Sequence, residues 1–121
     1  MSCFKVLIPA AGTGSRMKID TPKSLLKINS KSIISRIVNS LNSFDENPVI
    51  IINPIYLKNF KNNFKYEKNK PEFIFQEHAL GMGNAVLKFE NSIYFDKCEN
   101  IILIWGDIPY ISLKTIKTLV D

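Results

Sequence analysis

The sequence predicts an α/β protein with a mostly parallel sheet, on three observations. Short runs rich in β-branched residues recur along the 121 residues, segments with helical spacing separate them, and each run is continuously apolar. Strands that alternate with helices form parallel sheets joined by right-handed crossovers, with helices on the faces of the sheet. We therefore expect each strand to be buried on both faces.

The apolar runs and their spacing place the elements. Strands are predicted over 4–9, 49–53, 73–76 and 101–105. The clearest helix is predicted over 32–44, because apolar residues recur there at three- and four-residue steps, namely Ile33, Ile34, Ile37, Val38 and Leu41.

Two further segments complete the pattern. The lysine- and asparagine-rich chain around 64–72 is predicted to be an exposed connection, and SLKTIKTLVD (112–121) a helix with Ser112 as its N-cap. The sequence stops within this last pattern without a C-cap glycine. We expect residues 1–121 to form a single domain that is the N-terminal half of a larger fold.

Composition narrows the class of protein. Apolar residues make up 45% of the chain and charged residues 22%, which is typical of a globular protein, and no apolar run is long enough to span a membrane. We expect a cytoplasmic protein with no membrane partner. The two cysteines, Cys3 and Cys98, stand apart without a CxxC pair or a histidine cluster, so neither a disulfide framework nor a thiolate metal site is expected.

The formal net charge of +5 suits an anionic ligand. The basic residues, mostly lysines, are scattered, and no basic stripe alternates with stacking aromatic residues. Nucleic acid is therefore not an expected partner.

The stretch PAAGTGSRM (9–17) joins the first predicted strand to a glycine-containing loop. It does not match the Walker A spacing, and Met17 occupies the place of the third glycine in a dinucleotide fingerprint. Small residues let main-chain amides approach an anion closely, and two cations, Arg16 and Lys23, could neutralise its charge. The alternative is a tight strand-to-helix turn with incidental basic residues.

PAAGTGSRM followed by Pro22 and Lys23 resembles the signature of the nucleotidyltransferases that build activated sugars and alcohols. This resemblance implies a three-layer α/β/α, Rossmann-like (GT-A-like) fold, with Arg16 and Lys23 as catalytic residues. The nucleotide-binding residues that it implies in this loop are Ala10, Ala11, Gly12, Thr13, Gly14 and Ser15.

A second stretch, FQEHALGMGNAVL (75–87), is similar to the base-binding segment of bacterial N-acetylglucosamine-1-phosphate uridyltransferases. The resemblance implies that Gln76 and Gly81 help to read the nucleobase, and an amide side chain can offer a base edge both a donor and an acceptor. Met82 is also placed among the nucleotide-binding residues, although it stands where the family has a threonine that contacts the base, and Asn84 stands where the family has a histidine. The preference for uracil is therefore open.

A third stretch, IILIWGDIPYIS (101–112), delivers Asp107 just after an apolar strand. It resembles the family motif whose aspartate binds the catalytic magnesium, and Mg²⁺ prefers carboxylate and phosphate oxygens. The alternative is that Asp107 is a turn residue before Pro109.

The three motifs together imply Mg²⁺-dependent nucleotidyl transfer from a nucleoside triphosphate, with UTP favoured, to a sugar 1-phosphate. In the family, the acceptor site lies in the half of the domain that follows. The alternatives are a cytidylyltransferase acting on phosphocholine or a similar phosphorylated alcohol, and a non-catalytic nucleotide-binding module. The identity of the acceptor and the oligomeric state are not predicted.

Overall fold

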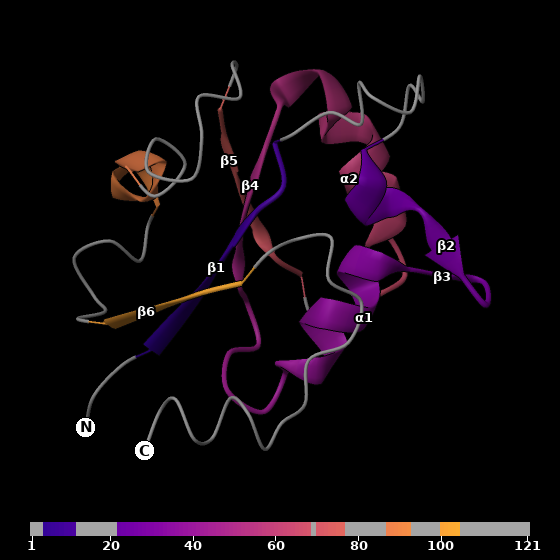
Figure 1. The fold of residues 1–121 in the computed structure, drawn as a ribbon, viewed down its shortest axis with the longest axis horizontal. Helices are drawn as coiled ribbons and strands as arrows, with labels where there is room; N and C mark the ends of the chain where they lie inside the picture. Colours follow the sequence, from indigo (N-terminus) through magenta and orange to yellow (C-terminus); the bar gives the residue numbers. More distant parts are fainter. Residues whose placement is uncertain (1–3, 12–21, 69, 77–86, 93–99, 105–121) are drawn as a thin grey trace.

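The computed structural model describes residues 4–11, 22–68, 70–76, 87–92 and 100–104. Its centre is a four-stranded sheet in the order β5-β4-β1-β6, in which every pairing is parallel (Figure 1). The strands are β1 (Phe4–Pro9), β4 (Val49–Ile52), β5 (Glu72–Phe75) and β6 (Asn100–Leu103). The four predicted strands are thus confirmed, each close to its expected bounds.

Helices and short turns cover the sheet. Helices α1 (Ile33–Ser40) and α2 (Leu57–Asn63) lie on one side of it, and the 3₁₀ turn η4 (Lys88–Asn91) lies on the other (Figure 1). A small antiparallel hairpin, β2 (Lys27–Ile28) with β3 (Lys31–Ser32), stands beyond the helices. The 3₁₀ turn η2 (Lys23–Leu25) precedes the hairpin, and the 3₁₀ turn η3 (Pro54–Tyr56) precedes α2. The described part therefore has the three layers that the resemblance implied.

The larger core cluster lies between the sheet and the two helices. All five apolar residues predicted to define the first helix are buried there. Helix α1 begins where the Ser32 hydroxyl accepts a hydrogen bond from the Ser35 amide at 3.1 Å, and it ends at Ser40 rather than at residue 44. The chain turns after Leu41, whose carbonyl accepts from the amides of Phe44 and Asp45.

The expectation that every strand is buried on both faces is confirmed at the centre of the sheet and wrong at its edges. All four residues of β4 are buried. In β6, by contrast, Ile101 is 38% and Leu103 40% exposed, and in β5 Phe75 is 44% exposed. Both are outer strands of the described sheet, so each has a strand neighbour on one side only. An apolar run predicts a strand but not its position in the sheet.

The exposed connection predicted around 64–72 is partly wrong. Tyr66 is 91% exposed, but Phe64 is 2% exposed and its ring lies 6.1 Å from that of Phe73. Phe64 directly follows α2 and anchors the end of that helix to β5. The helix predicted over 112–121 lies outside the described residues. Within the described ranges, no helix has the length and apolar character needed to cross a bilayer.

Candidate functional site

The carboxyl ends of the parallel strands bring two predicted nucleotide-binding segments to one edge of the sheet. The Ala10 amide, just after β1, donates to the Ile51 carbonyl at 2.7 Å, and the Gln76 amide, just after β5, donates to the Ile52 carbonyl at 2.9 Å. Both segments are therefore hydrogen-bonded to β4, one on either side of it. Ligands of parallel α/β sheets bind at this kind of edge.

The two alanines of the loop differ in the use of their main-chain amides. Because the Ala10 N–H already donates to Ile51, the amides that hold an anion have to come from Ala11 onward. Ala11 is 5% exposed, so its methyl group packs against the protein. The start of the loop is thus anchored in the sheet before the glycines begin.

Gln76 is only 4% exposed. An amide side chain is costly to bury unless its polar atoms are hydrogen-bonded, so a buried glutamine has a restricted orientation. This placement at the end of β5 is compatible with reading a base edge through a fixed donor and acceptor.

Lys23 has a fixed backbone and an exposed side chain. It begins η2, whose turn is closed by the Leu25 amide donating to the Pro22 carbonyl and the Leu26 amide to the Lys23 carbonyl, both at 3.0 Å. The Leu26 carbonyl in turn accepts from the Ile33 amide at 2.9 Å, which ties η2 to α1. Lys23 can therefore extend its ammonium toward a ligand from a rigid base.

Asn53 is a polar residue at the same edge that the sequence analysis missed. It directly follows β4, which lies between the two strands that precede Ala10 and Gln76, and its side-chain oxygen accepts from the Ile55 amide at 3.1 Å. The signal that could have found it is the one used for Asp107, a polar residue immediately after a buried strand.

The remaining predicted site residues lie outside the described part of the chain; they are Gly12, Thr13, Gly14, Ser15, Arg16, Gly81, Met82 and Asp107. The strand that leads to Asp107 is described. After β6 the Ile104 amide donates to the Leu7 carbonyl at 3.0 Å, so this strand runs beside β1 toward the same edge. Asp107 follows Ile104 by three residues.

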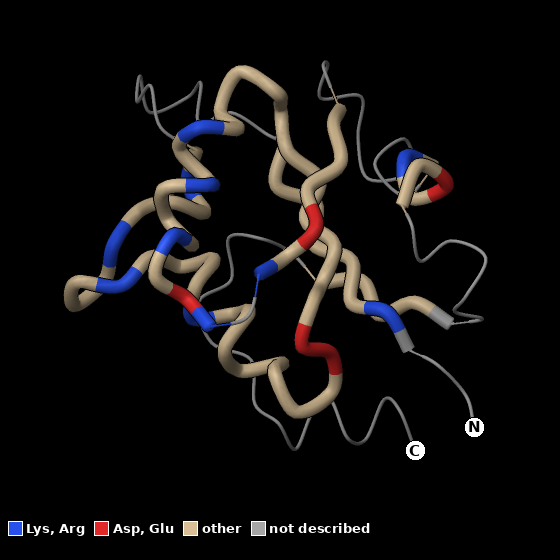
Figure 2. The backbone as a smooth tube through the Cα atoms, turned by 180° about the vertical axis from the view of Figure 1, so that it is seen from behind, with Lys and Arg blue, Asp and Glu red and all other residues tan. Residues whose placement is uncertain are grey.

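Basic residues gather on one side of the described chain. Figure 2 shows blue segments along the hairpin and α2, away from β6. They include Lys27 and Lys31 on the hairpin and Lys58 and Lys61 on α2. Positive potential on this side attracts anions to the flank of the sheet that also carries Lys23.

Residues 6–121 match the family model described as the MobA-like NTP transferase domain. The chain belongs to this family. The expected membership of a nucleotidyltransferase family is thus confirmed.

Curated relatives of this NTP transferase domain include proteins named bifunctional protein GlmU. The one from Buchnera aphidicola subsp. Baizongia pistaciae (strain Bp) is 35% identical over 116 residues, which are 96% of this chain and 25% of that protein. The chain thus spans about a quarter of the length of the curated relatives that it matches.

Solved structures support the fold of the domain. CMP:2-keto-3-deoxy-manno-octonic acid synthetase, in complex with CTP, matches with a TM-score of 0.74 at 17% identity, over 98% of this chain and 46% of that one. The 4-diphosphocytidyl-2C-methyl-D-erythritol synthase from Anaerococcus prevotii DSM 20548 matches with a TM-score of 0.74 at 13% identity, over 99% of this chain and 52% of that one. At these identities the likeness shows the α/β fold alone.

Proposed function

We propose that this chain is the nucleotide-binding part of an enzyme that transfers a nucleotidyl group from a nucleoside triphosphate, with UTP favoured, to a sugar 1-phosphate. The observation that carries the proposal is the common sheet edge at which the loop beginning at Ala10 and the base-side residue Gln76 are both hydrogen-bonded to β4. In this proposal, residues 1–121 form one domain and the protein is located in the cytoplasm.

In the proposed reaction, a phosphate oxygen of the sugar 1-phosphate attacks the α-phosphorus of the triphosphate. The bond between that phosphorus and the bridging oxygen to the β-phosphate breaks, and pyrophosphate leaves with the electron pair. The nucleophile is already an anion, so no general base is needed. Catalysis then depends on positioning and on neutralising charge around the α-phosphate.

The residues of the chain have separate proposed roles. The loop amides from Gly12 to Ser15 and the Arg16 guanidinium hold the β- and γ-phosphates, and Lys23 extends from its rigid turn to the α-phosphate. Asp107 would hold the magnesium, because β6 leads toward the edge where the phosphates would lie and Mg²⁺ prefers carboxylate oxygens. When bound, Mg²⁺ neutralises charge on the phosphate oxygens.

A cytidylyltransferase acting on a phosphorylated alcohol is the second candidate. The specific observation in its favour is Met82, which replaces the threonine expected in the base segment of the uridyltransferases. A methionine cannot supply the hydroxyl, so the base preference has to come from other contacts.

Calorimetric titration with UTP and CTP, with and without Mg²⁺, tests both candidates. We expect Mg²⁺-dependent binding of UTP that is tighter than that of CTP and that weakens in Asp107→Asn. Tighter binding of CTP would favour the second candidate. Binding of neither nucleotide would refute the proposed nucleotide site, and equal binding by Asp107→Asn would refute the metal role of that residue.

A further inference from the structure

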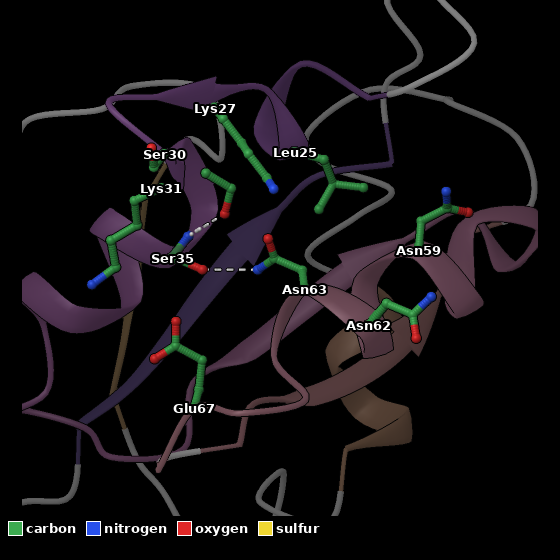
Figure 3. A pocket seen from close by; sticks show the side chains of 10 residues that line it. Leu25, Lys27, Ser30, Lys31, Ser35, Asn59, Asn62, Asn63 and Glu67 are labelled. Carbon is green, nitrogen blue, oxygen red and sulfur yellow. Dashed lines mark hydrogen bonds between the residues drawn. The ribbon is translucent and has the colours of Figure 1, made fainter.

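A polar cavity of about 400 Å³ lies on the flank of the molecule, between the β2–β3 hairpin, α1 and α2 (Figure 3). Its size is within the range of small-molecule sites. Ala10, Ala11, Lys23 and Gln76 are absent from its lining, so it is separate from the described part of the nucleotide edge. Its polar lining includes Lys27, Ser30, Asn59, Asn62, Asn63 and Glu67.

Part of the cavity wall is held in place by hydrogen bonds. Asn63, at the end of α2, donates its side-chain amide to the Ser35 hydroxyl of α1 at 2.8 Å. The Ser35 amide in turn donates to the Ser32 hydroxyl of the hairpin. This chain of contacts links the three elements around the cavity, so its shape is set by packed secondary structure rather than by a loop alone.

The cavity lining carries two positive charges and one negative charge. Lys27 and Lys31 come from the hairpin, and Glu67 follows α2. Figure 3 shows the Lys27 side chain pointing toward Asn63, with Lys31 and Glu67 on the side of Ser35 away from Leu25. The side chains of Asn59 and Asn62 project from α2. A ligand that carries both an anionic group and hydroxyl groups would match this lining, because an ammonium binds phosphate and carboxylate or amide oxygens accept from hydroxyls.

The hairpin turn provides an independent observation. Asn29 and Ser30 have positive φ angles of 52° and 69°, the left-handed region that two-residue hairpin loops require. Glycine is favoured at the second position, and a residue with a side chain costs about 1–2 kcal/mol in this conformation. Here the side chain is a serine that lines the cavity. Backbone strain of this kind is concentrated at functional sites.

We propose that this cavity is a binding site for a small phosphorylated sugar, with the phosphate at Lys27 and the sugar hydroxyls at the asparagines and Glu67. The site is distinct from the described part of the nucleotide edge and does not depend on the proposed reaction. The ring would rest near Leu25, an apolar side chain of the lining that belongs to the same short turn as Lys23.

Calorimetric titration of the 121-residue chain with glucose 6-phosphate tests the site, with glucose and inorganic phosphate titrated separately. We expect one glucose 6-phosphate per chain, bound at least tenfold more tightly than either part, a difference of about 1.4 kcal/mol. Absence of binding at millimolar concentration would overturn the proposal. Equal affinity for inorganic phosphate would overturn the assignment of a sugar ligand.

Variants locate the ligand. Lys27→Met should weaken glucose 6-phosphate binding at least tenfold, whereas Lys61→Met, which removes the same charge from an exposed position outside the cavity, should not change it. Equal loss in both variants would show diffuse attraction to surface charge and overturn the proposal. Retention of binding in Arg16→Ala is expected, and its loss would place the ligand at the nucleotide edge instead.

Ser30→Gly separates binding from folding. Glycine relieves the left-handed strain, so the free energy of unfolding should rise, while removal of the hydroxyl should weaken glucose 6-phosphate binding several-fold. A more stable variant with unchanged binding would exclude Ser30 from the site. That outcome would contradict the functional explanation of the strained turn.

Discussion

Replacing Asp45 with asparagine should lower the free energy of unfolding by about 3–5 kcal/mol, the usual cost of removing one partner from a buried ion pair. Asp45 lies before β4, and its carboxylate contacts the start of β1. One oxygen accepts from Lys5 Nζ at 2.9 Å and the other from the Val6 amide at 2.9 Å. The side chains of Lys5 and Asp45 are 5% and 7% exposed.

The expected magnitude follows from what asparagine leaves behind. Asparagine has nearly the same shape but only one accepting oxygen, so it cannot serve both Lys5 and Val6. The Lys5 ammonium then keeps its hydrogen bond to the Asn47 carbonyl, at 2.8 Å, but no longer has the negative charge of Asp45 beside it. An exposed pair would contribute only about 0–1 kcal/mol, so burial decides the size of the effect.

Urea denaturation measures this loss. With a slope of about 2 kcal/mol per molar urea, a loss of 3–5 kcal/mol lowers the midpoint by roughly 2 M. Glu46→Gln is the matched control, because it removes the same charge from the neighbouring, exposed residue and should change stability by less than about 0.5 kcal/mol.

The double variant Lys5→Met with Asp45→Asn provides the decisive comparison. Without the buried ammonium, the loss of the carboxylate costs less, so the double variant should be more stable than Asp45→Asn alone. An Asp45→Asn midpoint no lower than that of Glu46→Gln would refute the reasoning. So would a double variant whose loss equals the sum of the two single losses.

The remaining predictions concern a pair of buried serines and one lysine. Ser32→Ala removes the N-cap of α1 and should lower the free energy of unfolding by about 1 kcal/mol in urea titrations. Ser24→Ala should instead raise it by about 1 kcal/mol, because the buried Ser24 hydroxyl has no hydrogen-bond partner among the described residues; a loss would contradict this. Lys23→Ala in the complete enzyme should lower pyrophosphate release about a hundredfold, and near-normal release would refute its role.

The central sheet could be predicted from the sequence because the pattern that marks each strand lies within a few consecutive residues. Continuous apolar runs marked all four strands, and the spacing from Ile33 to Leu41 marked the face of α1 that is buried. The β2–β3 hairpin was not predicted, because Asn29 and Ser30 form its turn without the glycine that usually marks such a loop.

Features that depend on contacts between segments far apart in the chain could not be predicted from the sequence. Lys5 is the second residue of an otherwise apolar strand, and only the return of the chain forty residues later shows that Asp45 neutralises it. The order of the strands is also non-local, so the exposure of Ile101 and Leu103 could not be anticipated from their apolar run. At the site, the family motifs marked Ala10 and Gln76, whereas Asn53 carried no family motif.

The two ends of the sheet should therefore respond differently to substitution. At the amino end, Lys5 and Asp45 fasten β1 to the chain before β4 through a buried pair, so a change there alters the population of folded molecules. At the carboxyl end, main-chain hydrogen bonds hold the segments of Ala10 and Gln76, while the exposed Lys23 side chain can be removed without disturbing them. Asp45→Asn should thus lower stability and leave the nucleotide affinity of the folded chain unchanged. Lys23→Ala should lower the nucleotide affinity and leave the stability unchanged, because the Lys23 ammonium contributes charge at the ligand and little packing.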